Sequence, residues 1–165
     1  MKMIRLLIVF FSISTFNACD ILENQEISAI SSYTIKSGQS FGFCLGKCYS
    51  EMTIKGQNVE LLVKERSLSG GADQEIKYNY NEPIPANTTL AIEKSLDIEK
   101  FFALKEVYGC PDCADGGSEW IEVITDKDKS HKVTFEYGKT IPEINDLIVN
   151  LRQERQRLIE KYSKN

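Results

Sequence analysis

The sequence predicts an α+β fold in which an antiparallel β-sheet of about five to six strands is covered by a long C-terminal helix. Apolar and polar residues alternate over 51–55, 59–63, 119–125 and 131–137, which is the period of half-buried strands. From Ile144 onward apolar residues recur at intervals of three and four, the period of an amphipathic helix. A chain of 165 residues is long enough for one domain with a sizeable core.

The first half of the globular part predicts an antiparallel meander. Its four expected strands cover residues 33–36, 51–55, 59–63 and 76–80. Residues 37–40 are rich in serine and glycine and are expected to turn, and a cysteine loop follows at 41–48. The segment Gly56-Gln57-Asn58 closes the first hairpin, and a second turn at 69–73 precedes the last of these strands.

The second half adds helices and another hairpin. Pro83 and Pro85 exclude regular structure where they stand, and one or two short helices are expected over 88–104. The strands at 119–125 and 131–137 are joined by a charged loop. Thr140-Ile141-Pro142-Glu143 has the spacing of a capping box with an early proline and should begin the last helix.

Composition excludes several classes of function. The formal net charge is −4, so nucleic acids and anionic lipid surfaces are not expected partners. His131 is the single histidine, so the metalloprotease pattern HExxH is impossible and any catalytic triad would depend on this residue. We assign no catalytic residue, no metal ligand and no cofactor.

Residues 1–19 have the features of an exported leader. Lys2 and Arg5 form a positive region, residues 4–16 are apolar, and Ala18 precedes Cys19. This segment resembles the bacterial lipobox, and the resemblance implies that Cys19 becomes the first mature residue, with acyl chains on its sulfur and its amine. A plain signal peptide cut after Ala18 and an uncleaved membrane anchor are the alternatives. The apolar run is shorter than the roughly 20 residues that a spanning helix needs.

This interpretation divides the chain into a lipoprotein signal peptide (1–18), a lipidated tether (19–32) and a single globular domain (33–165). Several acyl chains anchor a protein far more stably than one does. The expected location is therefore the cell membrane or the outer membrane, with the domain facing the periplasm or the exterior and the lipid as its link to the membrane.

Four further cysteines, Cys44, Cys48, Cys110 and Cys113, are spaced as C-x3-C and C-x2-C. Structural disulfides are the first interpretation, because exported domains meet an oxidising compartment. A redox-active Cys110/Cys113 pair and a four-thiolate zinc site are the alternatives. Chain entropy favours a long bridge, about 4 against about 2 kcal/mol, whereas closeness in sequence favours local bridges, so spacing alone leaves the connectivity open.

Other polar groups receive structural interpretations. Asp112, Asp115, Glu119 and Glu122 do not fit the calcium-loop pattern and are interpreted as part of a tight acidic turn. His131 is expected at the surface, and Trp120 and Tyr137 are expected to pack on the sheet. The solvated face of the last helix is expected to carry Arg152, Glu154, Arg155, Arg157 and Glu160.

Two stretches also resemble known sequences. Residues 43–54, with Cys44-Leu45-Gly46-Lys47-Cys48, are similar to the C-x-G-x-C opening of a family of small bacterial exported proteins known only as a domain of unknown function. Residues 109–120, with Cys-Pro-Asp-Cys-Ala-Asp-Gly-Gly, look like a run found in uncharacterised lipoproteins. The resemblance implies a shared fold and location, and it implies local bridges, Cys44–Cys48 and Cys110–Cys113.

The sequence therefore predicts a lipid-anchored, extracytoplasmic, non-catalytic module for binding or for association with the cell envelope. Its membrane contact is the N-terminal lipid, and its protein or small-molecule partner is left open. The alternative is a thiol-disulfide oxidoreductase that uses Cys110 and Cys113. The sequence after Cys113 counts against this alternative. It is acidic and rich in glycine, whereas a thioredoxin-like site would have a helix there.

Overall fold

The computed structural model describes residues 32–69, 72–127 and 129–162. The predicted signal peptide, Cys19 and the tether up to residue 31 lie outside the described residues. Within the described part of the chain, no helix is both long enough and apolar enough to cross a membrane.

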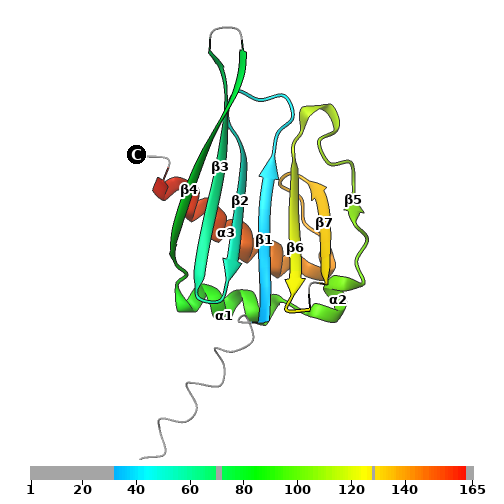
Figure 1. Ribbon diagram of the computed structural model, residues 1–165. Helices are drawn as coiled ribbons and strands as arrows, with labels where there is room; N and C mark the ends of the chain where they lie inside the picture. The colour runs from blue at the N-terminus through cyan, green and yellow to red at the C-terminus, as the bar shows by residue number, and fades with distance from the viewer. Residues whose placement is uncertain (1–31, 70–71, 128, 163–165) are drawn as a thin grey trace, which may run out of the picture.

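Seven strands form one mixed sheet in the spatial order β4-β3-β2-β1-β6-β7-β5 (Figure 1). They are β1 (Tyr33–Ser40), β2 (Gly46–Lys55), β3 (Asn58–Ser69), β4 (Ala72–Pro83), β5 (Val107–Tyr108), β6 (Ser118–Thr125) and β7 (Ser130–Glu136). Neighbouring strands are antiparallel except β5 and β7, which are parallel. The predicted α+β class is confirmed, whereas the strand count of five to six and the wholly antiparallel sheet are wrong because of β5.

The strand boundaries also differ from the prediction, since β1, β2, β3 and β4 are all longer than the expected strands. The segment 37–40, expected to turn, is the second half of β1. Its residues pair with β2 on one side and with β6 on the other. Pro83 is the last residue of β4 and lies opposite Asn58. A proline is tolerated there because β4 is an edge strand, whose outer side needs no ladder hydrogen bond. The two residues of β5 are too few to show an alternating pattern.

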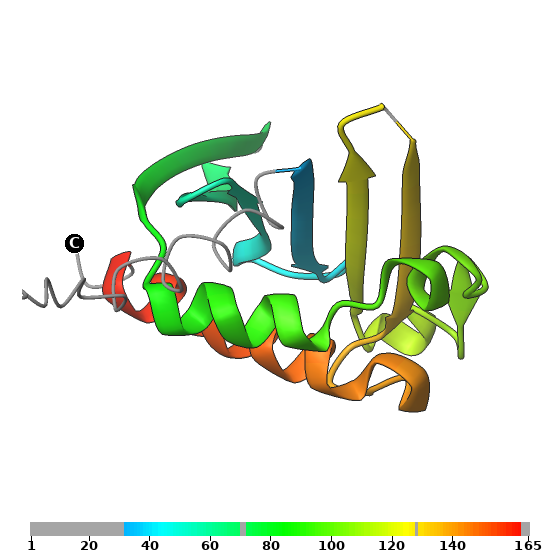
Figure 2. The ribbon, with the colours of Figure 1, turned by 90° about the horizontal axis from the view of Figure 1, so that it is seen from below.

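The helices α1 (Ala86–Ser95) and α3 (Asn145–Tyr162) cover one face of the sheet, and α2 (Ile98–Phe102) lies near the start of β7. Figure 2 shows α1 and α3 side by side under the sheet, with the opposite face left open. Asn150 of α3 donates to the carbonyl of Ala91 in α1 at 3.1 Å. The predicted capping box does not form: residues 142–144 make a 3₁₀ turn that has Ile141 at its start and no side-chain cap.

The hydrophobic core lies between this helical layer and the sheet. Alternate residues of the central strands point into it and meet apolar residues of all three helices. Its fully buried members include Ile35, Met52, Ile54, Leu61, Ile92, Phe101, Ile121, Val123, Leu147 and Leu151. Burial at this face fixes the register of every strand, because a slip by one residue would turn the apolar set toward solvent.

Candidate functional site

Both cysteine pairs lie at the end of the sheet where β1 finishes. The structure places Cys44 and Cys48 at disulfide distance, with Cα atoms 5.6 Å apart, and Cys110 and Cys113 likewise, with Cα atoms 5.5 Å apart. This is the local pairing that the family resemblance implied. We call the two loops, residues 41–48 and 109–117, the cysteine end.

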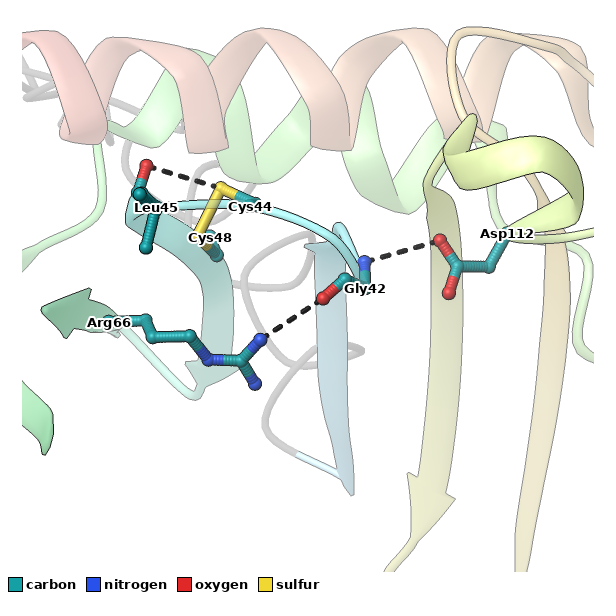
Figure 3. The surroundings of a disulfide bond; sticks show 6 residues. All are labelled: Gly42, Cys44, Leu45, Cys48, Arg66 and Asp112. Atoms are coloured by element: carbon teal, nitrogen blue, oxygen red, sulfur yellow. Dashed lines mark hydrogen bonds between the residues drawn. A yellow bond between two sulfur atoms is a disulfide. The ribbon is translucent and has the colours of Figure 1, made fainter. Parts of the chain in front are cut away.

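The two loops of the cysteine end are linked to each other and to β3 (Figure 3). The amide of Gly42 donates to Asp112 Oδ1 at 3.3 Å, and Arg66 Nη1 donates to the carbonyl of Gly42 at 3.1 Å. Phe41 packs so closely on Gly117 that a Cβ there would lie 2.5 Å from the phenyl ring. The loops therefore form one connected surface, although 70 residues separate Gly42 from Asp112.

Large apolar side chains are exposed on this surface. Phe43 is 88% exposed and Leu45 is 65% exposed. Leu45 lies inside the short loop that the Cys44/Cys48 pair closes, and Phe43 directly precedes Cys44. Tyr137 is also exposed and packs edge-on against Phe41 of the loop after β1, with ring centroids 4.7 Å apart, so its aromatic contact is with this loop and not with the sheet face. Apolar groups displayed on a restrained loop are a common basis for protein binding, since little conformational entropy is lost on association.

The backbone around Cys110 does not provide the setting of a thioredoxin-like thiolate. Asp112, Ala114 and Asp115 have positive φ angles of 61°, 51° and 60°, and only a 3₁₀ turn of three residues follows. No α-helix N-terminus stabilises negative charge at this position. The backbone amide of Cys110 is instead bound to the Glu136 carboxylate at 2.8 Å, which disfavours a nearby thiolate.

The predicted acidic turn is only partly formed. Glu119 is buried on the helical face of β6, whereas Glu122 lies on the open face and pairs with Lys36 at 3.6 Å. Only Asp112 and Asp115 remain in the turn itself. Among the described residues, no group of three or more His, Cys, Asp and Glu side chains is arranged to hold a metal ion.

The expected solvated face of α3 is wrong for Arg155 and Glu154, which are buried. Arg155 Nη2 donates to Glu119 Oε1 at 3.0 Å, and Arg155 Nη1 donates to Ser37 Oγ at 2.5 Å. Arg152 Nη2 donates to Glu119 Oε2 at 2.6 Å. Burial lowers the pKa of Arg155, and the neighbouring guanidinium of Arg152 lowers it further. The negative charge of Glu119 raises this pKa but does not outweigh the burial.

The sequence contains a signal for this buried cluster. Arg155 is four residues after Leu151 and three before Leu158, so it lies on the apolar stripe of the helix. Glu119 is two residues before Ile121 and therefore shares the buried face of β6. Position along the helix and the strand, and not charge, therefore indicates the burial of Arg155 and Glu119.

A second cluster fastens the end of α3 to β4. Arg157 Nη2 lies 2.7 Å from Glu82 Oε1 and 2.6 Å from Glu154 Oε1, and Glu82 also accepts from Lys161 and from the Tyr162 hydroxyl. Burial alone would raise the pKa of Glu82, but the hydrogen bonds from Lys161, Tyr162 and Arg157 outweigh it and lower the pKa to about 2. Tyr80 and Tyr162 stack with ring centroids 4.2 Å apart.

A groove of about 450 Å³ lies beside the first cluster, between α3 and the segment after β7. Its walls include Gln39, Tyr137, Arg152, Gln153 and Gln156. Tyr137 also contacts Phe41, so the groove adjoins the cysteine end. Of the residues singled out in the sequence, those that line this groove are Glu119, Tyr137, Arg152, Arg157 and Glu160.

The remaining predicted residues have structural surroundings. Trp120 is buried on the open face, where its Nε1 donates to Glu51 Oε2 at 3.3 Å and its ring lies 5.3 Å from that of Tyr49. His131 is not a simple surface residue: its Nε2 donates to the Leu104 carbonyl at 3.0 Å, and its ring packs against Phe101 and Phe102.

Comparison with protein families finds no match to this chain, and neither the curated proteins nor the solved structures contain a match. The lipobox and the family resemblance therefore stay predictions from the sequence.

We predict that Cys110→Ser lowers the free energy of unfolding by about 2 kcal/mol, because the bridge to Cys113 closes a very short loop. Urea unfolding under oxidising conditions measures this change, and Cys44→Ser should have an effect of similar size. Non-reducing peptide mapping of the natural protein should find Cys44 joined to Cys48 and Cys110 to Cys113. Insulin reduction that disappears in Cys110→Ser would instead favour the oxidoreductase.

Proposed function

We propose that this protein is a lipid-anchored, extracytoplasmic, non-catalytic binding module that holds a partner protein at its cysteine end. The observation that carries the proposal is the exposure of Phe43 and Leu45, at 88% and 65%, on either side of Cys44, which is paired with Cys48. Hydrogen bonds from Gly42 and Arg66 restrain the same loop. Burying these two side chains in a partner would remove apolar area from water without first ordering the loop.

The direction of β1 supports the placement of this surface. The predicted tether precedes Tyr33, the first residue of β1, and the cysteine end follows Ser40, the last residue of that strand (Figure 1). An anchor at Cys19 would thus attach to the end of the sheet opposite the exposed loop. A loop in that position is available to a protein beyond the membrane surface.

A protein partner is favoured over a lipid surface by the local chemistry. Three carboxylates, Asp112, Glu65 and Glu75, line the hollow next to the loop against two cations, Lys64 and Arg66, and the whole chain is negative. Carboxylates at this position repel anionic headgroups. Two apolar side chains also bury much less area than the face of a membrane-bound amphipathic helix.

The anchor is tested by mass spectrometry of the protein from its native envelope, with an N-terminus at acylated Cys19 expected. Binding is tested by placing a photo-crosslinking residue at Leu45 in the lipidated protein and identifying the adduct. Purified partner should then bind Phe43→Ser at least tenfold more weakly, since an apolar anchor of an interface contributes more than about 1.4 kcal/mol.

Ile76→Ser is the matched control, because Ile76 is a half-exposed apolar residue on β4, outside the cysteine end. It should bind the partner like the unaltered protein. Equal loss of affinity in both variants would contradict a site at the cysteine end. Binding to lipid vesicles that requires Phe43 would replace the protein partner with a membrane.

A further inference from the structure

We propose that the groove beside α3 binds a small organic carboxylate, whose negative charge is received by Arg152. This inference does not depend on the cysteine end binding a protein. It follows from a count of buried charges, from the shape of the hollow beside them, and from the chemistry of the groups that line it.

Two guanidinium groups share one carboxylate at the base of the groove. Arg152 and Arg155 both donate to Glu119, whose oxygens lie between 2.6 and 3.2 Å from their nitrogens. Their other partners are uncharged: Arg155 bonds Ser37 and Gln39, and Arg152 bonds the Lys139 carbonyl at 2.7 Å. Over the described residues, no second carboxylate forms an ion pair with either arginine. The group therefore carries one excess positive charge.

The neighbouring cluster shows what full compensation looks like in this protein. Arg157 has ion pairs with two carboxylates, Glu82 and Glu154, and Lys161 shares the first of them. Two cations therefore face two anions there. The cluster of Arg157 and Lys161 is therefore balanced, whereas the cluster of Arg152 and Arg155 has one carboxylate for two cations. An uncompensated charge taken out of water costs several kcal/mol, and a bound anion offsets this cost.

Access to the excess charge is possible only through Arg152. The side chain of Arg155 is 2% exposed, whereas that of Arg152 is 29% exposed and lines the groove. Glu119 is as deeply buried as Arg155. Of the two arginines that bind Glu119, an anion in the groove would therefore meet Arg152, with Arg155 and Glu119 behind it as fixed support. Arg157 also lines the groove, but it is already paired with Glu82 and Glu154.

The groove has the size and lining of a small-molecule site. Its volume of about 450 Å³ lies within the range of about 300–1,000 Å³ that is usual for ligand pockets. Gln39, Gln153 and Gln156 provide amide groups that can donate or accept hydrogen bonds, and Tyr137 provides an aromatic wall. These groups suit an organic molecule with a polar body and do not form a bare anion cage.

The charge balance selects a carboxylate over a phosphate. One excess positive charge is neutralised by a monoanion, whereas a phosphate monoester carries about −1.5 to −2 at neutral pH. Glu160, which is outside this charge count, also lines the groove and repels the additional negative charge of a dianion. The planar guanidinium of Arg152 presents paired donors that match the two oxygens of a carboxylate.

The test measures binding of benzoate, lactate and N-acetyl amino acids to the full-length protein by ligand-observed NMR and thermal shift at constant ionic strength. The neutral amides of the same compounds are the controls for shape, and inorganic phosphate is the control for anions in general. At least one carboxylate is expected to bind, and its amide is expected to bind at least tenfold more weakly. Absence of binding by every carboxylate at tens of millimolar, or stronger binding of phosphate, overturns the proposal.

Variants test the location. Arg152→Gln should weaken carboxylate binding at least tenfold, whereas Lys132→Gln removes a cation from the opposite face of the sheet and should leave the affinity unchanged. Gln39→Glu is the decisive variant, because residue 39 already contacts Arg155 and the substitution supplies the missing carboxylate at almost the same shape. It should raise the melting temperature and abolish carboxylate binding. Unchanged binding in both Arg152→Gln and Gln39→Glu overturns the assignment to this groove.

Discussion

Glu119→Gln is expected to lower the free energy of unfolding by about 3–5 kcal/mol, because it removes the one carboxylate that faces Arg152 and Arg155. A glutamine side chain keeps the shape but cannot neutralise a buried guanidinium. Arg155, which is almost completely buried, cannot reach solvent without moving α3 away from β1. Urea unfolding followed by circular dichroism measures the change, and a fall of the melting temperature by about 10 °C should accompany it.

The matched control for this prediction is Glu122→Gln. Glu122 belongs to the same strand, but it lies on the open face and its ion pair with Lys36 is partly exposed. A pair of this kind contributes at most about 1 kcal/mol. If Glu119→Gln were no more destabilising than Glu122→Gln, the buried cluster would not be a determinant of stability and the charge count on which the groove proposal depends would be wrong.

Patterns of apolar residues predicted most of the architecture. The alternation over 51–63 and 119–137 located two hairpins of the sheet, and the helical period after Ile144 located α3, because burial of one face imposes these periods directly on the sequence. The order of strands was not predictable in the same way. It depends on β6 pairing with β1 across about 85 residues of chain, and local patterns carry no information about such a pairing.

Residue type misled the prediction where tertiary contacts override local preference. Ser37-Gly38-Gln39-Ser40 has the composition of a turn, yet each residue of this segment has partners on both neighbouring strands. Arg155 was assigned to solvent as a charged residue, although a guanidinium can be buried when a carboxylate and a hydroxyl satisfy it. The groove beside α3 could not be predicted, since Gln39 and Tyr137 are brought to Arg152 only by the folded sheet.

Gly38→Ala is expected to destabilise the protein by about 3 kcal/mol, because the indole of Trp120 occupies the space above this glycine. Gly38 lies directly opposite Trp120 on one side and Glu51 on the other. The indole crosses Gly38 and donates to Glu51, and a Cβ at residue 38 would lie 2.0 Å from Cζ2 of the ring. Even the smallest side chain must therefore displace the ring from a position in which it is only 5% exposed.

Fluorescence gives this prediction a second readout, because Trp120 is the only tryptophan of the chain. In Gly38→Ala the emission of the native state should shift to longer wavelength as the indole leaves its contact with Tyr49 and becomes hydrated. Trp120→Val provides the control through a double-mutant cycle. With a small residue at 120 the clash is absent, so adding Gly38→Ala to Trp120→Val should cost much less than adding it to the unaltered protein. Strictly additive losses would mean that Gly38 is required by the backbone of β1 and not by the packing of the Trp120 indole over it.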